Sequence, residues 1–360
     1  MNVLLVTMEM NIGGAETHIL ELAKELKRRE HNVFVASAGG KLVAELEEFG
    51  VTHIEAPLKD KKPNDVLASI KIIRNIIRTN KIDIVHAHAR IPGFICGYVC
   101  KREKVHFVTT IHGIYKVNFL LKLLTNWGEK TLAVSEDIKK YGIDEYKLNP
   151  ENIKITVNGI DLNRFCKKEI SEDLGINLDA NKKTIIHISR IDAESSKVAE
   201  TLIEVADELD KRLNGAQVLI VGAGNYLEEL KKKAEGKSNV ILAGQRTDVD
   251  KVLNKADLFV GVSRAALEAM ATELPVILVG NPDYGQGYLG EFTSDKLESA
   301  VENNFTCRGL EVLDKNALLE DIVKILSADN TEKGKFNRKV VQDNYSVGKM
   351  TDDALELYKF

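Results

Sequence analysis

The sequence predicts an α/β protein made of two domains, each built around a parallel β-sheet. The chain has 360 residues, enough for two domains of roughly 100–200 residues each. Short runs of Val, Ile and Leu alternate with amphipathic stretches along the chain. The runs are continuously apolar, which is typical of parallel strands covered by helices on both faces. This strand–helix series occurs twice, so we expect two separate sheets.

The first domain is predicted at 1–165. Amphipathic helices are expected at 17–29 and 66–79, where apolar residues recur with helical spacing. Helices of this kind supply the crossovers that parallel strands need. The strands of this domain are expected at 2–7, 32–37, 82–87, 105–110, 131–134 and 153–157.

The second domain is predicted at 183–346. The stretch 166–182 is polar, acidic and irregular, and we interpret it as the linker. A last helix at 347–358 has no strand of its own, so we expect the tail 347–360 to pack back on the first domain. The strands of the second domain are expected at 183–188, 217–222, 239–243, 257–262 and 275–279, and its main helices at 198–213 and 266–271.

The composition excludes several classes of protein. Hydrophobic residues make up 44% and charged residues 29% of the chain, as in soluble globular proteins. A net charge of −4 argues against nucleic acid as the main partner. Residues 1–165 carry 24 basic against 20 acidic side chains, and the rest 26 against 34. The basic half suits an anionic surface or acceptor, although two ordinary solvated surfaces explain the difference equally well.

The N-terminus and the cysteines indicate a cytoplasmic protein. A strand begins at residue 2 without a charged leader, and no apolar run reaches the ~18 residues of a membrane helix. The four cysteines lack metal-binding spacing, so we expect free thiols. A helical apolar stripe is either core packing, which we favour, or an interfacial helix that holds the first domain at the inner membrane face. The stripe consists of Phe119, Leu120, Leu123, Leu124 and Trp127, with Lys116, Lys122 and Lys130 around it.

Three motifs in the first domain follow strand ends. Gly13 and Gly14 stand between the first strand and the first helix, where they form either a tight turn or a site for an anion at the helix N-terminus. His112 follows a strand and precedes a glycine, a position from which it can reach a ligand. His86 and His88 resemble a metal-binding pair but lack a third ligand nearby. We therefore expect hydrogen-bonded histidines and no metal site.

Two clusters in the second domain suit a phosphorylated ligand. Arg190 ends one strand and Lys197 follows across a short loop, an arrangement that suits a diphosphate. Ser263 is a plausible N-cap, so the amides after it, at Arg264 and Ala265, form an anion site. Glu268, one turn further, is either a ligand for a ribose diol or a helix-stabilising surface acid. The segment Gly222-Ala223-Gly224 lacks the third glycine of a dinucleotide fingerprint and is interpreted as a turn.

The order of these motifs resembles the family 4 glycosyltransferases, and the resemblance covers nearly the whole chain. It predicts two Rossmann-like domains facing across a cleft, the arrangement called GT-B. The matching motifs are GGAE at 13–16, DIVHAH at 83–88, TIHG at 110–113, AVSE at 133–136, NGID at 158–161 with Arg164-Phe165, SR at 189–190 with Lys197, and EAMA at 268–271.

The resemblance implies transfer of a sugar from a nucleotide diphosphate, with uridine the commonest base, to a cell-surface glycan or lipid. Arg190 and Lys197 would hold the diphosphate and Glu268 the ribose. Gly14 would approach the distal phosphate, and His112 would bind the transferred sugar. The reaction would need no metal and no cofactor and would retain the configuration at the sugar carbon.

The chain departs from this family in its donor motif. Family members carry another glutamate before the one matched by Glu268, and eight residues earlier this chain has Val260. The glycine-rich segment 280–291 is predicted to replace the missing turn, with Glu291 as the lost carboxylate. A mobile surface loop is the alternative. The shortened region also resembles an inverting N-acetylglucosaminyltransferase, so both stereochemical outcomes stay open.

Two hypotheses from other classes remain. One is a nucleotide-sugar 2-epimerase, which shares the architecture but needs several catalytic acids, for which only Glu291 and Asp283 are candidates. The other is a donor-binding protein without catalysis.

Overall fold

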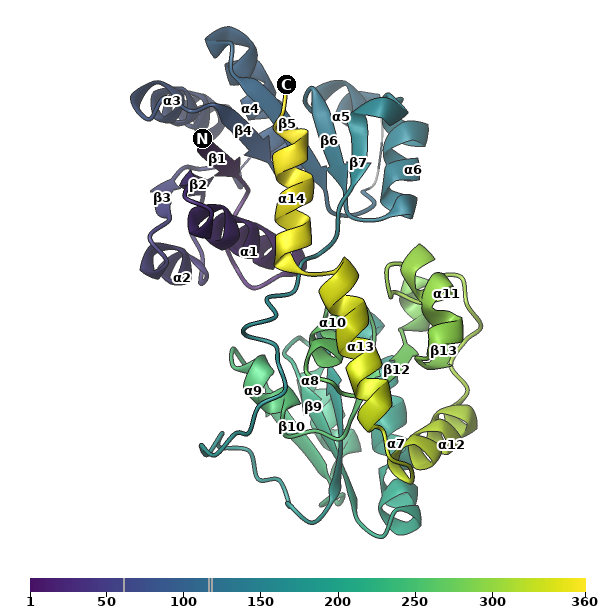
Figure 1. Cartoon of the computed structure of the whole chain (residues 1–360). Coiled ribbons are helices and arrows are strands. Elements are labelled where there is room, and N and C mark those ends of the chain that lie inside the picture. Colours follow the sequence, from purple (N-terminus) through teal and green to yellow (C-terminus); the bar gives the residue numbers. More distant parts are fainter. Residues whose placement is uncertain (61, 116, 118) are drawn as a thin grey trace. The chain divides into compact units, whose positions relative to one another are not determined.

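The computed structural model divides into two compact units (Figure 1). It describes residues 1–60, 62–115, 117 and 119–360, with the backbone alone at 120 and 123. Unit 1 contains Met1–Gly159 and Tyr345–Phe360, and unit 2 contains Ile160–Asn344. Each unit has its own sheet and its own core. The predicted α/β class with two sheets is therefore confirmed.

Unit 1 is built on a seven-stranded parallel sheet in the order β3-β2-β1-β4-β5-β6-β7. The burial of its side chains explains why the sequence forms the central strand β1. Val3 and Leu5 point into one core and Leu4 and Val6 into another, so the strand is apolar throughout. The strands are β1 (Asn2–Val6), β2 (Asn32–Ser37), β3 (Thr52–Glu55), β4 (Ile84–Ala87), β5 (His106–Ile111), β6 (Lys130–Ala133) and β7 (Ile153–Ile155).

The last helix of the chain, α14 (Val347–Leu357), packs on α1 (Gly14–Arg28) within unit 1. Met350 and Ala354 are fully buried in the same core as the apolar face of α1. At the helix surface, Arg29 Nη1 lies 2.6 Å from Asp352 Oδ1. The other helices of the unit are α2 (Val43–Glu48), α3 (Pro63–Thr79), α4 (Arg90–Glu103), α5 (Phe119–Leu124), α6 (Glu136–Tyr146) and the 3₁₀ turn η1 (Pro150–Asn152).

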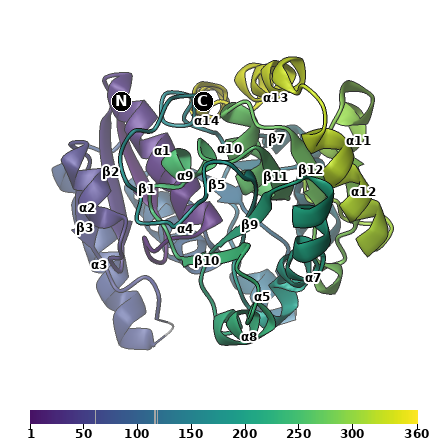
Figure 2. The same ribbon diagram turned by 90° about the horizontal axis from the view of Figure 1, so that it is seen from below.

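Unit 2 is built on a six-stranded sheet in the order β10-β9-β8-β11-β12-β13. Five strands are parallel, and the edge strand β13 runs antiparallel to β12. Helices α7 (Lys197–Arg212) and α12 (Lys315–Leu326) lie side by side against this sheet (Figures 1 and 2). The strands are β8 (Lys183–Ile188), β9 (Ala216–Val221), β10 (Val240–Gly244), β11 (Leu258–Gly261), β12 (Val276–Val279) and β13 (Tyr288–Glu291).

The helices of unit 2 cover its sheet, and α7 and α12 bury an apolar core on one face of it. Amphipathic α7 buries Val198, Leu202 and Leu209 completely. The helices are α7 (Lys197–Arg212), α8 (Leu227–Lys233), α9 (Val249–Leu253), α10 (Ser263–Ala271), α11 (Leu297–Glu302), α12 (Lys315–Leu326) and α13 (Thr331–Asn344), with 3₁₀ turns η2 (Ala193–Ser195), η3 (Pro282–Tyr284) and η4 (Ser294–Lys296).

The segment 166–182, predicted as a linker, is instead part of unit 2. Its polar residues form ion pairs and hydrogen bonds with other residues of that unit. Lys168 Nζ lies 2.8 Å from Asp250 Oδ2, and the backbone of Asp179 exchanges hydrogen bonds with the Gln217 side chain. The irregular composition indicated a free connector, but its side chains satisfy polar groups at the edge of a folded unit.

None of the helices in the described part of the chain is long and apolar enough to cross a membrane. The predicted apolar stripe divides between core and surface. Trp127 is buried, whereas Phe119 is 85% exposed and Leu124 is exposed as well. Lys116 and the side chains of Leu120 and Leu123 lie outside the described residues.

Candidate active site

The carboxyl ends of the parallel strands in unit 2 bring together the residues predicted to bind a diphosphate. The turn Gly222-Ala223-Gly224 follows β9 and packs closely on the loop after β8. A Cβ atom added at Gly222 would lie 1.9 Å from the Ser189 carbonyl oxygen, and one at Gly224 would lie 2.1 Å from that of Ile191. These glycines therefore allow two backbones to approach, as the interpretation of this segment as a turn requires.

Arg190 and Lys197 stand on either side of this loop and are only loosely held. The Arg190 side chain is 72% exposed, with Nε 3.9 Å from Asp192 Oδ2. The Lys197 side chain is 55% exposed, with Nζ 3.6 Å from Glu200 Oε2. The backbone between them is fixed, since Asp192 and Ser195 form a reciprocal capping box. Two mobile cations on a rigid loop can turn toward an anion at little energetic cost.

The start of α10 differs from the prediction in one respect. Val262 is the N-cap, and Ser263 is the first helical residue, with a left-handed φ of +60°. Its amide donates to the Phe305 carbonyl over 2.7 Å, so it is occupied within the chain. Ser263 is thus not the cap, and the anion site that remains begins with the amides of Arg264 and Ala265.

The Glu268 side chain is held by a neighbour on the same helix and is mostly shielded from solvent. Arg264 Nε donates to Glu268 Oε1 over 2.8 Å, and the two side chains are only 16% and 13% exposed. The pair with Arg264 stabilises the helix and also leaves the carboxylate in a defined position, so both interpretations of Glu268 stay open. Because its partner lies one turn earlier on the same helix, the carboxylate is fixed near the N-terminus of α10, on the edge that carries the loop of Arg190.

The glycine-rich segment after β12 reaches this edge, but Glu291 does not. The Asn281 side chain accepts a hydrogen bond from the Val198 amide over 3.2 Å, next to Lys197. Strand β13 then runs back along β12, so that Glu291 lies opposite Ile277, toward the amino end of β12.

At that position Glu291 is almost fully buried and forms ion pairs with Lys333 and, over 3.5 Å, with Lys324. The prediction that Glu291 replaces the missing sugar-binding glutamate placed it at the wrong end of the sheet. Asp283, in the same segment, is exposed.

In unit 1, the two glycines open the helix α1. Gly13 is its extended N-cap, and Gly14 is its first residue. A Cβ atom at Gly14 would have nothing within 4 Å, whereas one at Gly13 would lie 2.3 Å from Glu16 Oε2. The backbone of Gly14 therefore opens on free space at the positive end of a helix dipole, which suits an anion.

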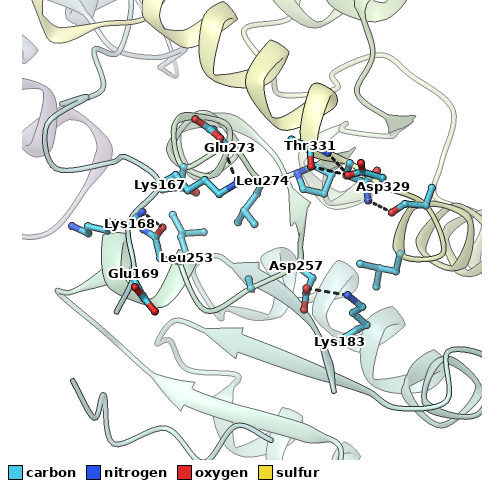
Figure 3. A pocket seen from close by; sticks show the side chains of 17 residues that line it. Lys167, Lys168, Glu169, Lys183, Leu253, Asp257, Glu273, Leu274, Asp329 and Thr331 are labelled. Carbon is cyan, nitrogen blue, oxygen red and sulfur yellow. Dashed lines mark hydrogen bonds and ion pairs between the residues drawn. The ribbon is translucent and has the colours of Figure 1, made fainter. Parts of the chain in front are cut away.

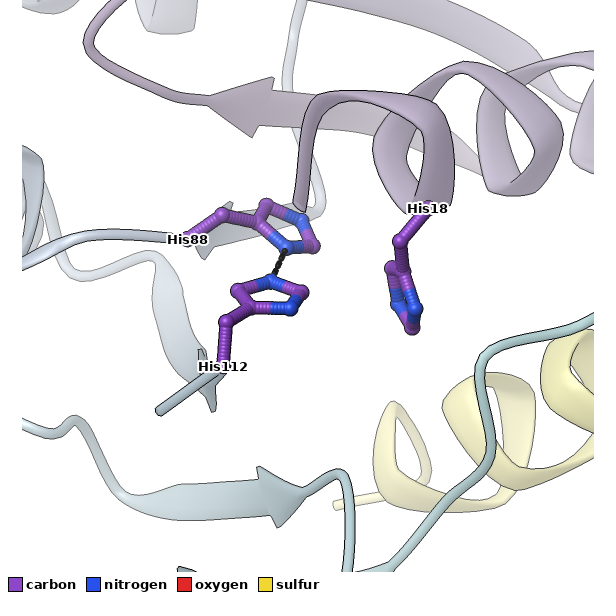
Figure 4. Close-up of side chains that lie close together, drawn as sticks. All are labelled: His18, His88 and His112. Atoms are coloured by element: carbon purple, nitrogen blue, oxygen red, sulfur yellow. Dashed lines mark hydrogen bonds between the residues drawn. The ribbon is translucent and has the colours of Figure 1, made fainter. Parts of the chain in front are cut away.

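Four histidines of unit 1 lie close together. His88 Nδ1 lies 3.1 Å from His112 Nε2, and the His18 ring centroid lies 4.9 Å from that of His112 (Figure 4). His86 stacks on His88 and is bonded through Nδ1 to Tyr358 and through Nε2 to Thr110, each over 2.7 Å. His86 is thus the hydrogen-bonded core histidine that the sequence predicts.

Burial favours the neutral form of His86, His88 and His112 by lowering their pKa values. Burial and the nearby His18 lower the pKa of His86 to about 3. Burial and the other histidines likewise hold the pKa values of His88 and His112 well below the ordinary value. A neutral His112 can donate or accept a hydrogen bond to a sugar hydroxyl without adding charge.

Sequence reasoning missed two members of this group, His18 and Asn158. His18 Nδ1 lies 3.2 Å from Asn158 Oδ1. His18 stands four residues after Gly14 on α1, a spacing that gives no signal of its own. Asn158 belongs to an Asn-Gly pair that predicted only a turn.

A cavity of about 660 Å³ lies elsewhere in unit 2 (Figure 3). Lys183, which begins β8, and Asp257, which precedes β11, line it and form an ion pair at 3.5 Å. The cavity is thus at the amino ends of the strands, whereas open parallel sheets bind ligands at the carboxyl ends. Its other lysines, Lys167 and Lys168, also face carboxylates. We therefore do not take it as the substrate site.

The chain is similar to sugar-transferring enzymes. Residues 12–164 match the family described as Glycosyltransferase Family 4, and residues 182–303 match that described as Glycosyl transferases group 1. Over 302 residues it is 26% identical to N-acetyl-alpha-D-glucosaminyl L-malate synthase of Bacillus anthracis, covering 76% of this chain and 77% of the relative.

Two further comparisons agree. Over 325 residues the chain is 23% identical to UDP-Gal:alpha-D-GlcNAc-diphosphoundecaprenol alpha-1,3-galactosyltransferase of Escherichia coli, covering 81% of this chain and 79% of the relative. The crystal structure of a glycosyltransferase from Rickettsia africae matches with a TM-score of 0.78 at 23% identity, covering 99% of this chain and 98% of that one. At this identity the structural likeness shows the fold.

Proposed function

The chain is a glycosyltransferase of the family 4 and group 1 type, and we propose that it transfers a sugar from a UDP-sugar to a cell-surface glycan or lipid. The observation that carries the proposal is the carboxyl edge of unit 2. There, loosely held Arg190 and Lys197 and the N-terminus of α10 gather positive charge, and the fixed carboxylate of Glu268 stands beside it.

Departure of the nucleoside diphosphate requires stabilisation of two phosphate charges. The Arg190 guanidinium can bind two phosphate oxygens, and Lys197 adds a second cation. The amides of Arg264 and Ala265 add hydrogen bonds and the helix dipole. The amides are fixed before the reaction, so charge that develops on the leaving group meets these donors already in place. The two cations turn toward the diphosphate when it binds.

Glu268 and the unit 1 residues supply the remaining contacts in this proposal. A carboxylate held by Arg264 can accept two hydrogen bonds from a ribose diol, which would orient the nucleoside. Gly14 leaves room for the distal phosphate, and neutral His112 bonds a hydroxyl of the transferred sugar. With Glu291 paired to lysines, we assign no carboxylate among the described residues as a nucleophile. This favours displacement on the face from which the diphosphate leaves, with retention of configuration.

A lipid or glycan acceptor of the cell envelope is proposed from the relatives and the charge distribution. The E. coli relative is named for a diphosphoundecaprenol substrate. Residues 1–165 are the basic half of this chain, and Phe119 and Leu124 are exposed beside Lys122. Flotation with anionic liposomes at low and high salt tests peripheral contact, because a basic surface should bind only at low salt. Equal recovery at the two salt concentrations, or no binding at all, would contradict it.

The epimerase hypothesis depends mainly on Glu291 as a catalytic acid. It requires catalytic acids near the reacting carbon, and Glu291 lies at the opposite end of β12 from the proposed donor edge. Incubation of the protein with a panel of nucleotide sugars distinguishes the hypotheses. We expect release of UDP that depends on an added acceptor. A C2 epimer would indicate an isomerase, and binding without release would indicate a donor-binding protein.

A further inference from the structure

His18, His88 and His112 lie close enough to act together on one ligand. One ring nitrogen of each lies within 4.8 Å of a ring nitrogen of each of the others. The three residues come from the first turns of α1, the end of β4 and the end of β5, so unit 1 alone assembles the cluster (Figure 4). We propose that they form a binding site for a transition metal ion that prefers nitrogen ligands, with Zn²⁺ as the best fit, and that the bound ion inhibits the transferase.

The distances fit such an ion. Two imidazole nitrogens that bind one tetrahedral Zn²⁺ at ~2.0–2.1 Å lie about 3.3 Å apart. His88 Nδ1 and His112 Nε2 are already 3.1 Å apart. These two nitrogens therefore need almost no movement. A ring nitrogen of His18 lies within 4.8 Å of the other two and has to approach them by at most about 1.5 Å.

The hydrogen bond of His18 leaves its other nitrogen suited to be a ligand. The Oδ1 atom of Asn158 only accepts hydrogen bonds, so His18 Nδ1 carries the proton in the 3.2 Å contact between them. His18 Nε2 then carries the lone pair. Histidines that bind metals usually donate their second ring nitrogen to an oxygen in this way, which fixes the tautomer and the orientation of the ring.

The residue types of the cluster favour an ion that binds nitrogen ligands. Three histidines without a carboxylate suit Zn²⁺, Ni²⁺ or Cu²⁺ and suit Mg²⁺ and Ca²⁺ poorly, because the latter prefer oxygen.

Inhibition follows from the role proposed for His112, and this part rests on the proposed function. Once Nε2 of His112 binds an ion, it can no longer bond a sugar hydroxyl. Metal binding itself does not depend on that role, so it can be measured in the absence of donor and acceptor.

Binding is tested with Co²⁺, whose visible absorption reports tetrahedral coordination, and by competition with Zn²⁺. We expect one Co²⁺ per chain and displacement by Zn²⁺ but not by Mg²⁺. His88→Gln should abolish the tetrahedral spectrum. Asn158→Ala, which removes only the partner of His18, should weaken Co²⁺ binding about 10–100-fold. The matched control is His106→Gln, because His106 is an exposed histidine of the same unit beside Glu129, and this change should leave the spectrum intact.

Each result decides a separate claim. Absence of a tetrahedral spectrum in the wild-type protein, or an unchanged spectrum in a His88→Gln variant that melts at the wild-type temperature, would overturn the site. If His88→Gln does not fold, Asn158→Ala takes its place. Binding of Zn²⁺ without any loss of turnover relative to chelator-treated protein would overturn the inhibition. A protein that binds Zn²⁺ but transfers no sugar would contradict the proposed function and leave the metal site standing.

Discussion

Arg190→Ala should separate catalysis from stability. The Arg190 side chain is 72% exposed, and its only described ion pair, to Asp192, is at 3.9 Å. An exposed pair of this length contributes little, so we expect the free energy of unfolding to change by less than about 0.5 kcal/mol. In the transition state, however, the variant lacks a charge-assisted hydrogen bond to the leaving diphosphate, which is worth about 2–3 kcal/mol.

The expected loss is therefore about 30–150-fold in kcat/KM, since each ~1.4 kcal/mol corresponds to a factor of ten. The assay follows UDP release with saturating acceptor, and thermal unfolding is measured in parallel. Arg190→Lys should recover part of the loss, because it restores the charge but not the planar fork. Arg212→Ala is the matched control, since it removes a partly exposed arginine of the same unit that pairs with Glu320. A loss below about threefold in Arg190→Ala, or an equal loss in Arg212→Ala, would refute the assignment.

Three further predictions use the same measurements. Gly14→Ala should fold normally, because the added Cβ atom meets nothing within 4 Å, but should lower kcat/KM at least about tenfold if the distal phosphate lies there; wild-type activity would contradict this. Glu291→Gln should reduce the free energy of unfolding by about 1 kcal/mol or more, because it leaves Lys333 with a weaker partner, and should leave UDP binding by calorimetry unchanged; weaker binding would return Glu291 to the site. Burial lowers the pKa of His86 to about 3 and that of His187 to about 4, whereas both protonate below about 6.5 in the unfolded chain. As the pH is lowered through this range, the unfolded state takes up protons that the folded state does not. Urea denaturation should therefore show a free energy of unfolding that decreases as the pH is lowered from about 6.5 to about 5. A constant value would contradict the burial of these neutral rings.

The sequence predicted the central strands of both sheets because burial on both faces makes them continuously apolar. It missed β3 and β13, which are edge strands with few buried apolar residues: β3 reads Thr-His-Ile-Glu, and most of its residues are partly exposed. The direction of β13 was also beyond sequence reasoning. Because this strand runs antiparallel, Glu291 lies at the opposite end of the sheet from the loop that leads to it.

The site residues were predicted from the order of the motifs more than from any single motif. Arg190, Lys197 and Gly14 were chosen because each follows a strand, and parallel strands bring such positions to the carboxyl edge of their own sheet. The contact of His18 with His112 depends on the rotation of α1 about its own axis, which apolar periodicity fixes only to within a face of the helix. Ser263 was wrongly taken as the cap because its left-handed backbone is imposed by the carbonyl of Phe305, far along the chain.

Hydrogen–deuterium exchange of the whole protein with and without UDP tests the central claim, that the donor binds at the carboxyl edge of unit 2. We expect UDP to slow exchange in the loop 189–197, in the first turns of α10 up to Glu268, and in the segment 280–287. The peptides around Lys183 and Asp257, which line the large cavity at the other edge, should exchange at the same rate in both states. Protection confined to that cavity, or no protection by UDP in either place, would contradict the account.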